Sequence, residues 1–152
     1  MEKYNHYTQS REMEEKAKLA EEHEDFKLLP ISYEELEEEC RSDDVLKELF
    51  TEMINNCILY TETIIKFQKI AIAMNDTSSK RELMDDFSEI DAIRKVTHNT
   101  TIDSINILAR NLKDKSKNSK WIGKLSGNRA AYGRFAILIT FARILKDPNL
   151  NR

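Results

Sequence analysis

The sequence predicts an all-α protein: an antiparallel helical bundle of three long helices with a charged N-terminal helical extension. The 152-residue chain contains only three Gly and two Pro, which leaves room for long uninterrupted helices. Apolar residues recur at helical spacing through three long segments, and no segment shows the sustained alternation that is typical of strands. The length suits one domain, and 40% hydrophobic residues are enough for a core.

Residues 1–41 are predicted to form an acidic helical arm. A charged helix with a thin apolar edge is expected from about Ser10 to Phe26, and Pro30 ends it. Ser32 and Glu35 have the spacing of a capping box, which opens a short acidic helix. Because short amphipathic helices need packing partners, we expect the arm to rest on its own bundle or on a neighbouring chain.

Residues 42–147 are predicted to form the bundle, with a tail at 148–152. Apolar residues at helical spacing run from Leu46 to Met74 and define its first long helix. Ser79 and Glu82 have the spacing of a second capping box, which opens the second long helix. The connection between these helices is short, so we expect them to be antiparallel neighbours.

The last helix is predicted from Arg129 to Lys146, capped by Asn128, after a polar loop whose Trp121 closes one end of the bundle. Apolar side chains surround nearly all of this helix, and Gly133 within it indicates close approach of another backbone. Three other helices cannot bury such a helix in a small chain, so the sequence predicts a homodimer. The candidate interface residues are Tyr132, Phe135, Ile139, Phe141 and Ala142.

The second long helix carries two unusual features along its Phe87–Leu112 stretch. Asp91, Arg94 and His98 fall inside its main apolar stripe, where a buried charge needs a partner. We expect Arg94 and His98 to point inward, with the carboxylate of Asp91 or Glu62 within hydrogen-bond reach. A structural cluster and a ligand or catalytic pocket both remain open. The candidate polar site consists of Glu62, Asp91, Arg94, His98 and Asn99.

A second apolar set lies on another side of the same helix, at Ile93, Val96 and Ile107. A helix with two apolar sides is either central in a bundle or covered by a second subunit. These three residues are therefore predicted to be buried in one of those two ways.

The net charge of −3 conceals a division between the two ends of the chain. Residues 1–48 carry 16 acidic side chains and 7 Lys or Arg, whereas residues 110–152 carry 2 acidic and 11 basic ones. Such asymmetry indicates a charged partner, or docking of one end on the other. The candidate basic patch consists of Lys113, Lys115, Lys117, Lys120, Lys124 and Arg129.

Several function classes lack their sequence signals. The chain has no Gly-rich phosphate loop, no nucleophile elbow and no Cys/His metal spacing, so we predict no cofactor and no metal. Cys40 and Cys57 are expected to be reduced thiols in a cytoplasmic protein, because the N-terminus is polar and lacks a signal peptide. No apolar run is long enough for a membrane span.

The Tyr-x-Glu sequence at Tyr60 and Glu62, followed by Arg-x-x-x-His-Asn from Arg94 through His98 to Asn99, resembles a small bacterial family of helical proteins. That family is classed only as a domain of unknown function. The resemblance covers about half of the chain, from the first long helix through the last, and leaves the acidic arm as an extension. It implies a helical fold and draws attention to these five residues, but it implies no activity.

The pair Arg94 and His98 is also similar to the Arg–His ribonuclease motif of HEPN domains, which are dimeric helical bundles. That motif has four to six intervening residues, whereas this chain has three. A histidine would serve there as acid or base and an arginine would bind the phosphate.

These observations favour a non-enzymatic interaction protein that binds another macromolecule, most simply another protein, as a dimer. The Lys- and Asn-rich composition is typical of low-GC bacteria and their phages, which suggests a bacterial regulator or a phage inhibitor. The alternatives are a HEPN-like ribonuclease that uses Arg94 and His98, and nucleic-acid binding through the basic C-terminal segment.

Overall fold

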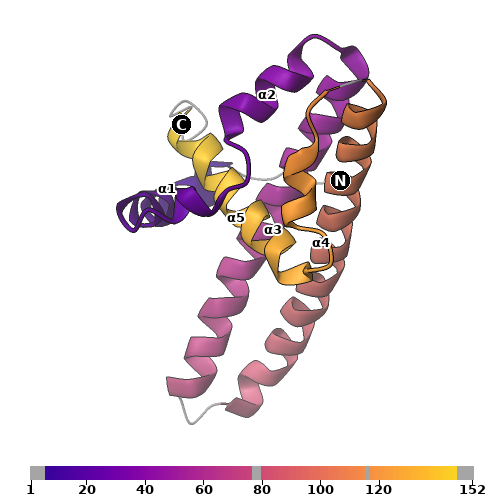
Figure 1. The fold of residues 1–152 in the computed structure, drawn as a ribbon. Helices are drawn as coiled ribbons and strands as arrows, with labels where there is room; N and C mark the ends of the chain where they lie inside the picture. The colour runs from indigo at the N-terminus through magenta and orange to yellow at the C-terminus, as the bar shows by residue number, and fades with distance from the viewer. Residues whose placement is uncertain (1–5, 77–79, 116, 147–152) are drawn as a thin grey trace.

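The computed structural model describes residues 6–76, 80–115 and 117–146, and within them it is all-α, as predicted (Figure 1). Ser79 of the second capping box and the tail at 148–152 lie outside the described residues. The helices are α1 (His6–Glu22), η1 (Asp25–Leu28), α2 (Tyr33–Arg41), α3 (Asp44–Asp76), α4 (Lys80–Asp114), η2 (Lys120–Lys124) and α5 (Arg129–Lys146). No helix in these ranges combines the length and apolarity that a membrane span requires.

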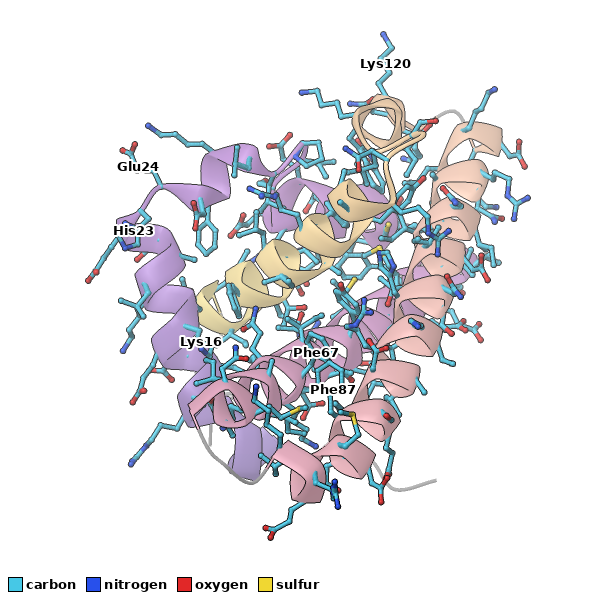
Figure 2. The ribbon with its side chains drawn as sticks, turned by 90° about the horizontal axis from the view of Figure 1, so that it is seen from below. Lys16, His23, Glu24, Phe67, Phe87 and Lys120 are labelled. Carbon is cyan, nitrogen blue, oxygen red and sulfur yellow. The ribbon has the colours of Figure 1, made fainter. Side chains whose placement is uncertain are left out.

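α3 and α4 form a long antiparallel hairpin, and α5 packs against both of them away from the turn (Figure 1). Between that turn and α5, the ring of Phe67 on α3 meets the ring of Phe87 on α4, with centroids 5.3 Å apart (Figure 2). The hairpin thus provides the surface on which the last helix rests.

The helix starts follow their capping residues. The backbone N–H of Glu35 donates to Ser32 Oγ at 3.1 Å, so Ser32 is the N-cap of α2, as predicted. The Glu35 carboxylate accepts from Ser32 Oγ at 3.0 Å, and this side-chain contact takes the place of the bond to the Ser32 backbone N–H that completes a capping box. Asp43 Oδ1 accepts from the third residue after it at 3.0 Å, and Asn128 Oδ1 does the same at 3.2 Å. α5 therefore begins where the sequence predicted, and α3 begins two residues after the predicted start of the bundle at residue 42.

The acidic arm rests on its own bundle. Its thin apolar edge at Ala17 and Ala20 is buried against Leu138 and Phe141 of α5. Between α1 and η1 the chain turns at Glu24, which has a φ of 60°, in the left-handed region (Figure 2). α2 then buries one face in the main core.

This packing corrects the predicted dimer interface. All five of its residues are wholly or partly buried within one chain, because α1 covers the side of α5 that α3 and α4 leave open. The surplus of apolar surface on α5 that motivated the prediction is therefore absent, and the interface was placed wrongly. The buried residues concerned are Tyr132, Phe135, Ile139 and Phe141, with Ala142 partly buried.

The second apolar set on α4 was predicted to be buried either within the bundle or by a second subunit, and the structure excludes the first of these. Ile93, Val96 and Ile107 are 41%, 64% and 38% exposed. α4 is therefore not enclosed on two sides by its own bundle. Burial by a second subunit, the other expectation, stays a prediction.

Trp121 takes the place that the sequence indicated. It is buried on η2 and stacks on Phe135 of α5, with ring centroids 5.5 Å apart. Leu125, after η2, is buried beside it in the same core. This segment therefore covers the N-terminal half of α5.

The opposite charges of the two chain ends meet at specific pairs. Lys115 Nζ lies 3.1 Å from a carboxylate oxygen of Asp43, and Lys146 Nζ lies 3.0 Å from Glu37. Glu37 of the arm therefore docks on a basic residue of its own chain, and Asp43, just after the arm, does the same. Such partly exposed pairs contribute little stability individually, so the apolar contacts of α1 carry the docking.

A charge inserted under α1 tests this docking. Ala17→Glu should lower the free energy of unfolding by about 2–4 kcal/mol, because it buries a carboxylate against α5. Leu19→Glu, at an exposed position on the same helix, should change it by less than about 0.5 kcal/mol. Urea unfolding followed by circular dichroism measures both, and equal effects would contradict the packing of α1.

Candidate functional site

Arg94 is held by its neighbour on α4. Its Nε and Nη2 donate to one carboxylate oxygen of Asp91 at 3.0 and 2.6 Å, and its guanidinium lies 5.0 Å from the centroid of the Phe67 ring. The side chains of Arg94 and Asp91 are 29% and 25% exposed. The hydrogen bond from Arg94 is the main cause that holds the pKa of Asp91 below its usual value. The expected carboxylate partner of Arg94 is therefore Asp91.

Glu62 stands apart from this pair. It lies on α3 and is 6% exposed, and no described residue hydrogen-bonds to its carboxylate. Burial raises its pKa to about 7, against a smaller opposing effect of Lys66. Of the two carboxylates predicted as partners of Arg94, Asp91 on the same helix is therefore the one that binds it, and Glu62 does not.

His98 contacts a backbone carbonyl and an aromatic ring. Its Nε2 lies 2.9 Å from the carbonyl oxygen of Arg129, the first residue of α5. A carbonyl only accepts, so Nε2 carries the hydrogen. The ring stacks on Tyr60 of α3 with centroids 5.2 Å apart. The expectation of a carboxylate partner for His98 is wrong, since helix packing aims the imidazole at α5 instead.

Partial burial, with the nearby charges of Arg129 and Arg94, lowers the pKa of His98, although its hydrogen bond to Arg129 opposes this effect. Its usual pKa is 6.5, so His98 is neutral at pH 7. A neutral imidazole that already donates its Nε2 hydrogen to a carbonyl is poorly placed for proton transfer through that nitrogen.

Asn99 completes the attachment of α4 to α5. Its side-chain oxygen accepts a hydrogen bond from the guanidinium of Arg129. His98 thus hydrogen-bonds to the backbone of Arg129, and Asn99 hydrogen-bonds to its side chain. His98 and Asn99, the last two residues of the Arg-x-x-x-His-Asn sequence, therefore position the start of α5.

Gly133 lies one turn further along α5. A Cβ atom at this position would lie 2.9 Å from the Tyr60 hydroxyl oxygen and 3.5 Å from His98 Nε2. The sequence indicated that another backbone approaches here, but the approaching groups are these two side chains. Any larger residue would push Tyr60 out of place.

Tyr60, Arg94, His98 and Gly133 line a cavity of about 630 Å³, which we call the Tyr60 cavity. Arg134 of α5 also lines it, and the arm contributes Ala20 and Asp25. The structure thus brings Arg94 and His98 of the predicted polar site together, whereas Glu62, Asp91 and Asn99 do not line the cavity. The sequence did not predict that Arg134 lies beside the polar site. Its position directly after Gly133, where close approach was expected, could have indicated this.

The six residues of the candidate basic patch do not act as one group. Lys115 pairs with Asp43, and Arg129 binds Asn99. The other four residues, Lys113, Lys117, Lys120 and Lys124, are exposed and make no ion pair with a described residue. Lys120 projects from η2 away from the bundle (Figure 2).

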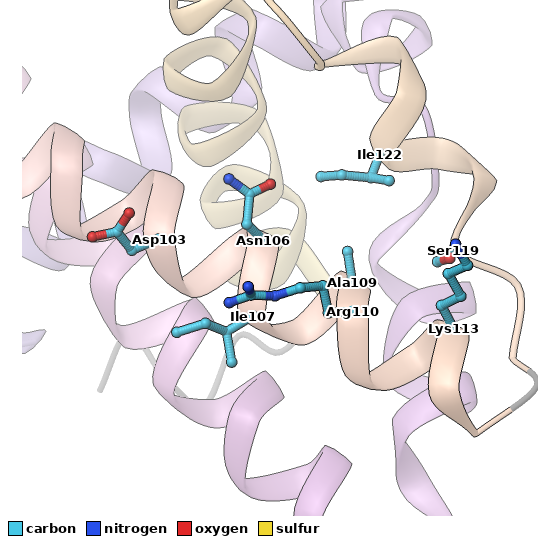
Figure 3. Close-up of a pocket in the computed structure, with 8 residues that line it drawn as sticks. All are labelled: Asp103, Asn106, Ile107, Ala109, Arg110, Lys113, Ser119 and Ile122. Carbon is cyan, nitrogen blue, oxygen red and sulfur yellow. The ribbon is translucent and has the colours of Figure 1, made fainter.

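A second hollow, of about 590 Å³, lies on the outer side of α4 beside η2 (Figure 3). Ile107, Ala109 and Ile122 give it apolar walls. Its charged lining is mixed, because Asp103 stands beside the basic Arg110 and Lys113. It is continuous with the exposed apolar set of α4, because Ile107 belongs to both.

Comparison with known proteins gives no match to a protein-family model, a curated protein or a solved structure. The resemblance to a bacterial family of unknown function therefore stays a prediction. Among the described residues, no group of three His, Cys, Asp or Glu side chains is placed to hold a metal ion.

Because the Arg94–Asp91 pair is partly exposed, its removal should lower the stability of the fold only slightly. Arg94→Ala should lower the free energy of unfolding by about 1 kcal/mol, mainly through the lost contact with Phe67. Asp91 keeps Lys95, at 3.4 Å, and solvent. Lys95→Ala is the matched control and should be nearly neutral. Urea unfolding measures both, and a loss of about 3–5 kcal/mol for Arg94→Ala would instead indicate a buried pair.

The buried Glu62 predicts a pH dependence. Its pKa is about 7 in the folded protein and near 4.5 when exposed, so between these values the folded state binds the extra proton. Stability from this group is therefore lost as pH rises through that window. Relative to wild type, Glu62→Gln should be unchanged below about pH 4.5 and more stable by about 3 kcal/mol above pH 7. Unfolding at a series of pH values checks this, and a pH-independent difference contradicts it.

Proposed function

We propose that this chain is a non-enzymatic interaction protein that acts as a homodimer and binds another macromolecule. The observation that carries the proposal is the exposed apolar stripe on α4. Ile93, Val96 and Ile107 fall within about 60° of one another around the helix, at 100° per residue. Large exposed side chains gathered in one stripe mark interaction surfaces.

One charge pair along this stripe fits an antiparallel dimer. Glu89 precedes the apolar residues on this face, and Arg110 follows them at its edge. Two copies of α4 that cross in antiparallel fashion would place Glu89 of one near Arg110 of the partner subunit, and the two-fold axis would repeat this contact.

The register follows from the spacing of the two isoleucines. Thr100 lies seven residues from Ile93 and seven from Ile107. With Thr100 near the two-fold axis, Ile93 of the partner subunit approaches Ile107 and the hollow beside it (Figure 3). An apolar side chain seated in a hollow is a common anchor of protein interfaces.

The second partner is proposed to be an acidic surface of another protein. Lys120 and Lys124 on η2 are exposed at the end of the α4 stripe, and they remain accessible in such a dimer. The composition supports a cytoplasmic regulator or inhibitor of bacterial or phage origin. Nucleic acid is the alternative partner for these lysines, and a steep loss of binding with salt would favour it.

The involvement of His98 Nε2 with α5 supports a non-enzymatic role. The HEPN-like ribonuclease is the competing proposal. An RNA cleavage assay on wild type and His98→Ala separates the two. An equal cleavage rate for both proteins would exclude a ribonuclease that uses His98.

Sedimentation velocity tests the dimer. Wild type should sediment as a dimer at tens of micromolar, as expected for an interface of standard size. Val96→Glu should give a folded monomer, whereas Met84→Glu, at an exposed site on the opposite side of α4, should leave the dimer intact. A wild-type monomer, or a dimer that survives Val96→Glu, would contradict the proposal.

A charge exchange tests the antiparallel arrangement. Glu89→Lys alone should weaken the dimer by placing like charges together, and so should Arg110→Glu alone. The double variant should recover most of the lost affinity, because opposite charges then face each other again. Additive weakening in the double variant would exclude this orientation.

A further inference from the structure

The Tyr60 cavity has the size and the mixed lining of a small-molecule site. Its volume of about 630 Å³ lies within the range of known ligand pockets. Ile137, Leu138 and Phe141 of α5 form an apolar side. Tyr60, Arg94 and Arg134 supply polar groups from three different helices. An apolar wall with a few convergent polar groups is the usual composition of a binding pocket.

Tyr60 is the first observation that points to a ligand. The residue is only 7% exposed, and no described residue hydrogen-bonds to its hydroxyl. The hydroxyl oxygen itself is not one of the fully buried, unpartnered polar atoms of the described residues, and Tyr60 lines the cavity, so the oxygen can be reached from there. Gly133 has no side chain to cover it, since a Cβ would lie 2.9 Å from it. The hydroxyl is therefore available to donate to a molecule in the cavity.

The charge of the lining indicates what that molecule carries. Arg94 uses Nε and Nη2 for Asp91, which leaves Nη1 without a protein partner among the described residues. Arg134 is exposed at the cavity edge and makes no ion pair with any of them. Asp25 is the one acid among the described residues of the lining. Because Asp91 already balances the charge of Arg94, Arg134 is the guanidinium without an ion pair, and together with Nη1 of Arg94 it offers planar donors that suit an anion.

We propose that the Tyr60 cavity binds a small molecule in which a carboxylate or phosphate is attached to an apolar body. The anionic group lies between Arg94, Arg134 and the Tyr60 hydroxyl, and the apolar body packs on Ile137, Leu138 and Phe141. The arm forms one side of the cavity through Ala20 and Asp25. This site is independent of the proposed dimer, because none of its residues belongs to the exposed stripe of α4.

Isothermal titration with three eight-carbon probes tests the site. Octanoate and octyl phosphate carry the two anionic groups, and octanol is their uncharged match. Wild type should bind at least one of the anions, and octanol at least about tenfold more weakly, since a charge-assisted hydrogen bond is worth that much. The preferred anion then distinguishes a carboxylate ligand from a phosphate ligand.

Two variants connect this binding to the cavity. Arg134→Gln should weaken the preferred anion by about tenfold or more, and Tyr60→Phe should weaken it several-fold. Both should leave the fold intact, because Arg134 is exposed and the Tyr60 change removes only a hydroxyl. Arg81→Gln, at an exposed arginine near the start of α4, is the matched control and should bind like wild type.

Three results would overturn the proposal. The first is the absence of binding by both anions at millimolar concentration. The second is equal binding of octanol, which would show that the cavity does not recognise charge. The third is unchanged affinity in both Arg134→Gln and Tyr60→Phe, which would place the bound anion elsewhere on the protein.

Discussion

The fold depends on the burial of α5. This helix is apolar around nearly its whole circumference, and in 152 residues the α3–α4 hairpin can cover only part of it. The remaining side is covered by α1, whose few apolar residues are small enough for close helix contact at Ala17 and Ala20. A polar arm and an apolar helix, each unstable alone, therefore stabilise each other within one chain.

The same constraint explains the polar residues of α4. A helix that crosses the hairpin needs a fixed starting point, and His98 and Asn99 supply it by binding Arg129. Tyr60 stacks on His98 from the other side and reaches Gly133, where a side chain would collide with it. One glycine, one tyrosine and one histidine from three helices thus determine how closely α5 approaches. The space that remains beside them is the Tyr60 cavity.

Local sequence signals predicted most of the fold and only part of the site. The caps at Ser32, Asp43 and Asn128 depend on nearby residues, so their geometry follows from spacing alone. The partners of Glu62 and His98 depend on the angle between helices, which hydrophobic periodicity does not encode. The position of the arm was harder to predict, because it packs on α5 through the small residues Ala17 and Ala20, which give a weak hydrophobic signal. This is why surplus apolar surface on α5 was mistaken for a dimer interface.

The placement of the arm links stability to binding. Ala17 and Ala20 hold α1 on α5, and Ala20 also lines the Tyr60 cavity, so the contact that buries α5 forms one wall of the proposed site. Any molecule that binds this cavity in the folded state must stabilise the docked arm by mass action. Conversely, release of α1 would remove one wall of the cavity and expose Leu138 and Phe141. The exposed ion pairs of the arm are too weak to hold it. The small apolar edge of α1 therefore secures both the burial of α5 and one wall of the proposed site.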